Sequence, residues 1–170
     1  MKILIIALPR TGSTSLQVKY KKEYKLKSIF EPFDPLNDVE YNLNENDIVV
    51  KTMMYHTPND VDSGIDGYIK LSKQFDKTIL LSRKDLKECA ESWAYLKQYN
   101  HKNFNSTKPY VWKTTADFEN HLNDIYKWND ALIEISKILN IDITYYEDIF
   151  DKNSNERYRK NVIINKNKLI

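Results

Sequence analysis

The chain has few of the residues that build cross-links and metal centres. Its 170 residues include one cysteine, Cys89, and three histidines. A single cysteine excludes an internal disulfide and any zinc cluster built from several cysteines. The histidines, His56, His101 and His121, show no spacing that is typical of metal ligands. We therefore expect a protein without a bound metal.

Long apolar runs and a strong net charge are also absent. No run approaches the roughly 18 apolar residues that a membrane-spanning helix needs. The N-terminal run, residues 2–8, is too short for a signal peptide and is followed by Pro9 and Arg10. The 26 Lys and Arg nearly balance 24 Asp and Glu, so we expect neither nucleic-acid nor membrane binding. These features favour one soluble, cytoplasmic domain that spans residues 1–170.

The sequence does contain a regular alternation of apolar runs and amphipathic segments. Short continuous apolar runs indicate buried strands, and apolar residues three and four apart indicate helices. Expected strands cover residues 2–8, 28–33, 48–51, 77–82 and 141–146, and expected helices cover 13–24, 59–75, 86–96 and a long segment from 114. This alternation predicts an α/β fold in three layers, with a central parallel sheet flanked by helices.

The segment after the first expected strand, residues 9–15, combines several features of an anion-binding loop. A guanidinium, a glycine and four hydroxyls follow one another at Arg10, Thr11, Gly12, Ser13, Thr14 and Ser15. The first N–H groups of a helix lack intrahelical partners, and the helix dipole adds positive potential there. Arg10 matches phosphate or sulfate in shape, and Gly12 would let a ligand approach the backbone. The alternative is an ordinary strand-to-helix turn capped by a serine. We call residues 9–15 the anion loop.

The anion loop departs from the Walker A pattern of nucleotide-binding proteins, G-x-x-x-x-G-K-[ST]. Ala7 stands where the first glycine belongs, and Ser13 stands in place of the lysine. The stretch PRTGSTSL instead resembles the 5′-phosphosulfate loop of sulfotransferases that use 3′-phosphoadenosine 5′-phosphosulfate (PAPS). In that comparison Arg10 takes the place of the family's lysine or arginine.

A second motif, SRKDLKECAESW at residues 82–93, resembles the segment with which sulfotransferases bind the 3′-phosphate of PAPS. The family has an arginine at a strand end and a serine eight residues later. Here Ser92 lies eight residues after Lys84 and nine after Arg83. The resemblance implies that both cations lie near the phosphate without deciding which of them touches it. A third stretch, YYEDI at 145–149, is similar to strand ends that recur in the family.

Two residues are candidates for the general base that the family uses. The stretch FEPF is similar to a Glu-Pro stretch of carbohydrate-type sulfotransferases and points to Glu31, where the next proline should favour an extended backbone. Lys51 matches a VKTH-like stretch of the cytosolic members, whose histidine is the base, but here His56 comes three residues late. In an extended segment that shift moves a side chain by about 10 Å. The resemblance favours Glu31, with His56 as the alternative.

Together the motifs imply a PAPS-dependent sulfotransferase with a P-loop-like fold, closest in motif style to the carbohydrate-type branch. Such an enzyme transfers a sulfuryl group in line from PAPS to a hydroxyl or amine of a small-molecule or glycan acceptor. It releases 3′,5′-adenosine diphosphate (PAP) and needs no metal. Segments 34–47 and 101–113 should border the acceptor. The implied catalytic residues are Glu31, Arg10, His56 and Lys51, and the implied PAPS-binding residues are Arg10, Thr11, Gly12, Ser13, Thr14, Ser15, Arg83, Lys84 and Ser92.

Two other functions remain open at this point. One is a nucleotide or small-molecule kinase with a degenerate P-loop, which lacks the loop lysine and an obvious aspartate for Mg²⁺. The other is a non-catalytic protein that has the same fold and binds a phosphorylated nucleotide. Turnover of ATP with Mg²⁺ would favour the first, and tight nucleotide binding without transfer would favour the second.

Overall fold

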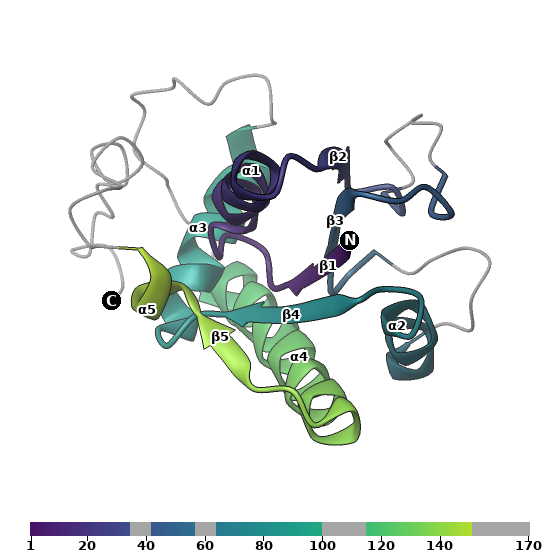
Figure 1. Ribbon diagram of the computed structural model, residues 1–170. Helices are drawn as coiled ribbons and strands as arrows, with labels where there is room; N and C mark the ends of the chain where they lie inside the picture. The colour runs from purple at the N-terminus through teal and green to yellow at the C-terminus, as the bar shows by residue number, and fades with distance from the viewer. Residues whose placement is uncertain (35–41, 57–63, 100–114, 151–170) are drawn as a thin grey trace.

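The computed structural model describes residues 1–34, 42–56, 64–99 and 115–150. Five parallel strands form one sheet: β1 (Lys2–Ala7), β2 (Lys27–Phe30), β3 (Ile48–Met53), β4 (Lys77–Ser82) and β5 (Ile143–Tyr145). The helices are α1 (Ser13–Glu23), α2 (Ile65–Ser72), α3 (Leu86–Tyr99), α4 (Thr115–Leu139) and α5 (Tyr146–Ile149) (Figure 1). Within these residues, no helix combines the length and the apolar character that crossing a membrane requires.

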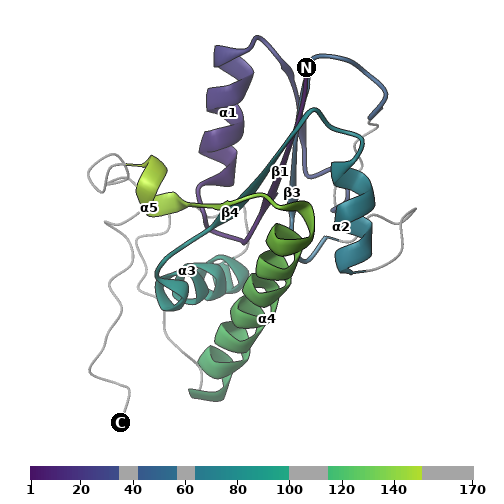
Figure 2. The same cartoon turned by 60° about the horizontal axis from the view of Figure 1, so that its bottom comes forward.

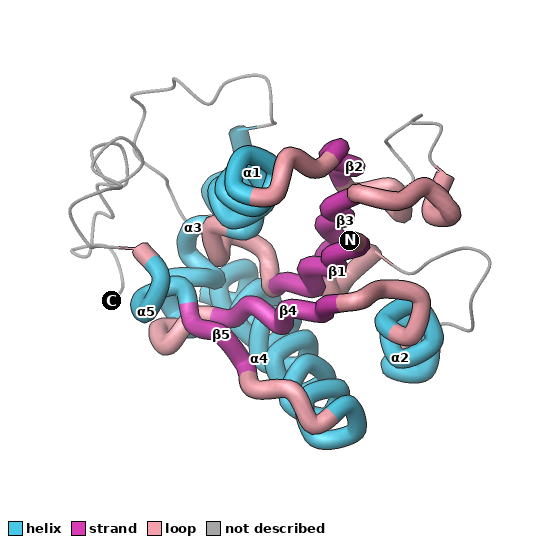
Figure 3. The backbone as a smooth tube through the Cα atoms, in the orientation of Figure 1, coloured by secondary structure: helices cyan, strands magenta, loops and turns pink. Residues whose placement is uncertain are grey.

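Helices cover both faces of the sheet, which gives the fold three layers (Figure 3). Successive strand residues point to opposite faces. Ile3 and Ile5 of β1 therefore pack with Leu16 of α1, whereas Leu4 and Ile6 pack with residues of α2, α3 and α4. Figure 2 shows α1 on one side of the strands and α2 and α4 on the other. The predicted α/β fold with a central parallel sheet is confirmed.

The strands follow the apolar runs of the sequence, but several of their bounds differ from the prediction by one to three residues. β3 is buried along its whole length, as expected for a strand covered on both faces. β2 ends at Phe30 because the chain turns after Glu31, where Pro32 cannot donate a ladder hydrogen bond. β5 ends at Tyr145, since Tyr146 begins the short helix α5. The first residues of the expected helix 59–75, residues 59–63, lie outside the described residues.

The strand order changes direction at the carboxyl end of β1. The order is β2-β3-β1-β4-β5, so the chain continues to one side of β1 with β2 and β3 and to the other with β4. Ala7 at the end of β1 is paired with Met53 of β3 and Leu81 of β4. Ligands of open α/β sheets bind beyond the carboxyl ends of the strands, at such a switch in strand order.

The packing of α5 against the anion loop explains the glycine at position 12. Gly12 has a φ of 71°, in the left-handed region that side chains disfavour. A Cβ at Gly12 would lie 2.9 Å from the ring of Tyr146 and 3.0 Å from the ring of Phe150. In this direction the missing side chain makes room for two aromatic rings rather than for a ligand.

We predict that Gly12→Ala lowers the free energy of unfolding by more than Gly64→Ala does. Gly64 also has a positive φ, 99°, but no described atom lies within 4 Å of its Cβ position. Gly64→Ala therefore introduces backbone strain alone, about 1–3 kcal/mol. Gly12→Ala adds overpacking against the two rings, typically a further ~1–3 kcal/mol. Urea unfolding followed by circular dichroism measures both losses, and equal losses would show that the rings move aside without cost.

Candidate active site

Residues that the motifs single out converge at the carboxyl edge of the sheet. Arg10 follows β1, Glu31 follows β2 and Arg83 follows β4. His56 comes three residues after the end of β3. Since all five strands are parallel, their carboxyl ends meet at one edge, and the loops that follow them lie side by side.

Side chains of the second motif hold the backbone and the side chain of Arg10. The Arg10 Nε donates to the Ser92 hydroxyl at 2.8 Å, and Arg83 donates to the Arg10 carbonyl at 3.3 Å. The Cys89 thiol donates to the Pro9 carbonyl at 2.9 Å. Burial raises the pKa of this thiol to about 12, so it keeps its proton. Arg10 has a φ of 62°, which is unusual for a residue with a side chain, and these contacts hold it there.

The hydroxyls of the anion loop differ in how they can serve a ligand. Thr11 is fully buried and donates back to the Leu8 carbonyl at 2.7 Å, so it stabilises the loop. Ser13 is also buried, whereas Thr14 and Ser15 are exposed. Among the residues that the structure describes, no side chain caps the start of α1, and no acidic residue lies in its first turn. The N-terminus of α1 thus offers backbone N–H groups and two exposed hydroxyls to an anion.

Lys51 places a buried positive charge beside the N-terminus of α1. Its side chain is 1% exposed, and its ammonium lies 2.5 Å from the Glu31 carboxylate. The same ammonium donates to the Thr14 hydroxyl at 3.0 Å and lies 3.6 Å from the centroid of the Phe30 ring. Burial lowers the pKa of Lys51, and the Glu31 carboxylate partly offsets this effect. The ion pair therefore ties the ends of β2 and β3 to the first turn of α1.

Two tight turns bring His56 next to Glu31. The Asp34 N–H donates to the Glu31 carbonyl at 3.1 Å, and the His56 N–H donates to the Met53 carbonyl at 2.9 Å. A four-residue turn returns its last residue to within about 7 Å of its first. The expectation that an extended segment carries His56 away from the strand end is therefore wrong. The expected extended backbone at Glu31 is also wrong, because its φ is 44°.

His56 is held deep between these turns. Its side chain is 4% exposed, and its Nε2 lies 3.6 Å from the Asp34 carboxylate. The Tyr68 hydroxyl of α2 lies 2.7 Å from the Met53 carbonyl oxygen and 2.6 Å from that of His56, which fixes the turn. Among the described residues, His56 Nδ1 has no hydrogen-bond partner. A buried polar atom without a partner typically costs about 1–3 kcal/mol, so Nδ1 is a candidate functional atom.

Burial keeps the imidazole of His56 neutral near pH 7. Burial lowers the pKa of His56, the carboxylates of Asp34 and Glu31 partly offset that effect, and Lys51 adds to it. A neutral imidazole has one nitrogen that carries a proton and one that can accept a proton. His56 therefore enters any reaction at neutral pH as a proton acceptor.

Arg83 and Lys84 of the second motif already have carboxylate partners. Arg83, 7% exposed, lies 2.8 Å from Glu88 of α3 and 3.5 Å from Glu147 of α5. Lys84 is exposed and pairs with Asp148 of α5. Arg83 thus joins α3, α5 and the anion loop, whereas Lys84 lies at the surface. A phosphate that binds here must compete with these carboxylates.

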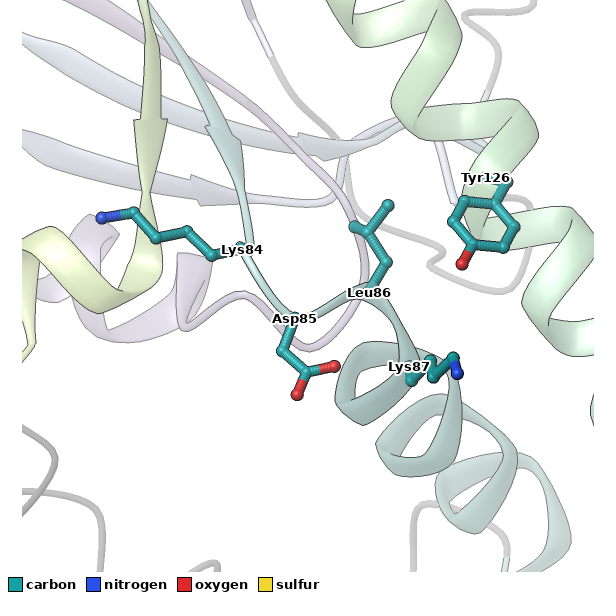
Figure 4. Close-up of a pocket in the computed structure, with 5 residues that line it drawn as sticks. All are labelled: Lys84, Asp85, Leu86, Lys87 and Tyr126. Atoms are coloured by element: carbon teal, nitrogen blue, oxygen red, sulfur yellow. The ribbon is translucent and has the colours of Figure 1, made fainter.

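Two depressions lie beside this constellation. One, of about 500 Å³, is lined by residues at the start of α3, with Lys84 and Lys87 among them, and by Tyr126 of α4. Figure 4 shows these lining residues. A second, of about 540 Å³, is lined by residues of α1, β4, β5 and α5. Neither is lined by Arg10 or His56. Most of the two segments expected to border the acceptor, residues 35–41 and 101–113, lies outside the described residues.

A group of possible metal ligands lies at the turns. Glu31, Asp34 and His56 each offer one ligand atom, and these atoms lie within 4.8 Å of one another. The Lys51 ammonium, 2.5 Å from Glu31, already supplies positive charge at this place and would repel a metal cation. We therefore assign no metal to this group.

The sequence placed Asp34 in a segment expected to border the acceptor but gave it no role of its own, and it did not single out Tyr68. Asp34 had a local signal, since a proline one residue after Glu31 and an aspartate two residues later are typical of a tight turn. Tyr68 had none, because its hydroxyl reaches carbonyls 12 and 15 residues away in the sequence.

Comparisons with known proteins leave the function to be argued from this geometry. A search of protein-family models finds no match to the chain, and a search of curated proteins finds no similar sequence. The geometry offers an anion site at the N-terminus of α1, two cations beside it, and a buried neutral imidazole on the neighbouring strand end. Such an arrangement suits the transfer of an anionic group to an acceptor that must lose a proton.

We predict that Glu31→Gln lowers the free energy of unfolding by about 3–5 kcal/mol, because it leaves the Lys51 charge buried without its carboxylate. The double variant Glu31→Gln, Lys51→Met removes both charges and should recover most of this loss. Urea unfolding of the wild type and the two variants, followed by tryptophan fluorescence, measures the difference. A double variant no more stable than the single one would contradict the assignment of the loss to an unpaired charge.

Proposed function

We propose that the chain is a PAPS-dependent sulfotransferase with a P-loop-like anion site. It would transfer a sulfuryl group from PAPS to a hydroxyl or amine of a small-molecule or glycan acceptor. The observation that carries this proposal is the pairing of Arg10 and Lys51 with an uncapped helix N-terminus that has no Walker lysine. The resemblance of the anion loop to the phosphosulfate loop of sulfotransferases supports the same conclusion.

The anion loop is the proposed place for the 5′-phosphosulfate. Backbone N–H groups at the start of α1 would donate to its oxygens, and the helix dipole would favour its charge. Ser92 presents the guanidinium of Arg10, and the Thr14 hydroxyl accepts a hydrogen bond from the Lys51 ammonium. Two fixed cations next to one helix N-terminus can stabilise a highly charged donor without a metal ion.

The proposed reaction is an in-line displacement at sulfur. The acceptor oxygen or nitrogen forms a bond to sulfur while the bond from sulfur to the bridging phosphate oxygen breaks. The electron pair of that bond goes to the 5′-phosphate of the product PAP, where Arg10 and Lys51 stabilise the growing negative charge. The proton of the acceptor passes to a base of the protein. The contribution of the chain is positioning and charge stabilisation, as in phosphoryl transfer.

The geometry supports His56 rather than Glu31 as this base, although the resemblance favours Glu31. For Glu31 to take a proton, its 2.5 Å ion pair with Lys51 would have to be given up. That loss would leave the Lys51 charge buried without a partner. His56 is neutral at physiological pH because burial lowers its pKa, and it can accept a proton without breaking an ion pair with Lys51. We therefore propose that Glu31 compensates the buried charge of Lys51 through their ion pair and does not act as the base.

We predict that PAPS and PAP stabilise the protein and that ATP with Mg²⁺ does not. At about 100 times its dissociation constant, a ligand adds roughly 2.7 kcal/mol to the free energy of unfolding. Labelled PAPS should also transfer sulfate to a member of a panel of glycans, phenols and amines. Arg10→Ala should reduce that transfer by about 10²–10³-fold, the scale of a lost oxyanion-hole donor, with an unchanged circular dichroism spectrum.

Other results of this experiment would support the competing functions. Stronger stabilisation by ATP with Mg²⁺ than by PAP would favour a kinase. Stabilisation by PAP without transfer to any acceptor would favour a non-catalytic binder of a phosphorylated nucleotide. Transfer by Arg10→Ala within a few-fold of the wild type would contradict the role of the anion loop.

We predict that Ser92→Ala weakens binding of PAP and of adenosine 5′-phosphosulfate alike, by about 10-fold. Ser92 accepts the hydrogen bond from Arg10 Nε, so its loss should disturb the site of the 5′-group that both ligands share. Lys84→Ala is the matched control, because an exposed cation near the 3′-phosphate should affect PAP alone. Isothermal titration calorimetry measures all four affinities. A loss confined to PAP in Ser92→Ala would show that Ser92 contacts the 3′-phosphate directly.

A further inference from the structure

We propose that Asp34 is a positioning residue that holds His56 with its proton on Nε2, so that Nδ1 accepts the proton of the acceptor. This inference rests on the proposed function, because it concerns the base of the same transfer. The protonation state of the two nitrogens can nevertheless be measured without any substrate.

The backbone brings Asp34 and His56 together through two turns at neighbouring strand ends. β2 and β3 are neighbours, and Phe30 at the end of β2 is paired with Lys51. The Glu31 N–H continues this ladder with a hydrogen bond to the Lys51 carbonyl at 3.0 Å. Each strand then enters a turn closed by a hydrogen bond from its fourth residue, Asp34 in one and His56 in the other. The fourth residues of two adjacent turns therefore face each other.

The position of the Asp34 carboxylate decides which imidazole nitrogen carries the proton. Asp34 Oδ2 lies 3.6 Å from His56 Nε2. An anionic oxygen favours a proton on the nitrogen that faces it, so Nε2 is the N–H and Nδ1 keeps its lone pair. The separation is longer than a hydrogen bond, as is common for catalytic pairs before the ligand binds.

The surroundings of Nδ1 fit a role as proton acceptor. Within the described part of the chain, this buried nitrogen has no hydrogen-bond partner. A hydroxyl or amine of the acceptor would supply the missing donor. The ring is held by Tyr55, whose own ring packs edge-on at 4.2 Å, and by Tyr68, whose hydroxyl contacts the His56 carbonyl. The imidazole therefore has a fixed direction in which to receive a proton.

The charged groups that act on the imidazole come from both strand ends. They are Asp34 and Glu31 after β2 and Lys51 of β3. The Tyr55 ring packs against the imidazole, and the Tyr68 hydroxyl contacts the His56 carbonyl. Glu31 is balanced by Lys51, so the Asp34 carboxylate is the larger of the two influences that raise the pKa of His56. After proton transfer, Asp34 faces the positive imidazolium and stabilises it.

With an alcohol acceptor, the proposed step moves one proton and one sulfuryl group. The O–H bond breaks, the proton goes to His56 Nδ1, and the oxygen forms its bond to sulfur. The electron pair of the bond from sulfur to the bridging oxygen stays on the phosphate of PAP. His56 then carries the proton and a positive charge opposite Asp34, and it returns the proton to solvent before the next cycle.

The test is a histidine titration by NMR in the full chain, with EDTA present to exclude trace metals. Protein labelled with ¹⁵N-histidine is titrated from about pH 5 to 9, the range in which imidazoles change charge. The His56 signals are those missing from His56→Gln. The variants are Asp34→Asn, Asp34→Glu as the conservative change, and Asp66→Asn as a control for an exposed carboxylate on α2.

We expect the wild type to show the proton on Nε2. Asp34→Asn should lower the pKa of His56 and mix the two neutral forms, because the amide removes the negative charge that favours both the imidazolium and the Nε2 proton. Asp34→Glu should retain the Nε2 form, and Asp66→Asn should match the wild type. A proton on Nδ1 in the wild type, or an unchanged titration in Asp34→Asn, would overturn the proposal.

Kinetics with PAPS separate this proposal from the proposed function. Asp34→Asn should lower kcat by about 10²-fold, the lower end for a general base, with little change in the KM for PAPS. The acidic limb of its pH–rate profile should move to lower pH with the pKa of His56. A kcat and pH profile equal to those of the wild type would overturn the role of Asp34. A wild type that transfers no sulfate would overturn the proposed function, and NMR would still decide the His56–Asp34 pair.

Discussion

The buried ammonium of Lys51 is the constraint on which this edge of the molecule depends. Removing a charge from water is costly, and the cost is offset only when the surroundings supply an opposite charge and hydrogen-bond partners. Glu31, Thr14 and the Phe30 ring supply them, each within 3.6 Å of the ammonium or closer. They come from the ends of β2 and the start of α1. The contacts of the Lys51 ammonium therefore fix the positions of β2, β3 and α1 relative to one another, and with them the anion loop and the two turns.

The anion loop depends in turn on the second motif. Arg83, Cys89 and Ser92 all contact Pro9 or Arg10, and Arg83 also joins α3 to α5. In the sulfotransferases that the sequence resembles, the corresponding segment is expected to bind the 3′-phosphate. In this structure the segment holds Arg10 in its strained backbone conformation. The spacing of the motif therefore serves to support the anion loop, and a direct contact with the ligand does not follow from the spacing alone.

The fold could be predicted from the sequence because burial on both faces leaves a continuous apolar signal. β1, β3 and β4 lie where such runs predicted them. The arrangement of the site could not be predicted in the same way. His56 returns to the strand end through a turn closed by its own N–H and held by Tyr68 of another helix. No local sequence pattern indicates that tertiary contact. Counting residues along an extended chain therefore placed His56 too far from the strand end.

Two carboxylates in one turn acquire different tasks from the groups that oppose them. Glu31 faces an ammonium at 2.5 Å and is committed to keeping that charge in the site, whereas Asp34 faces an imidazole at 3.6 Å. In the proposed transfer, negative charge grows on the donor phosphate while a proton leaves the acceptor. A single residue that both stabilised the phosphate and accepted the proton would have to be positively charged and basic at the same time. With Lys51 paired to Glu31 and His56 facing Asp34, the cation can stay protonated while the base stays neutral. β3 and the turn that follows it supply both the lysine and the histidine.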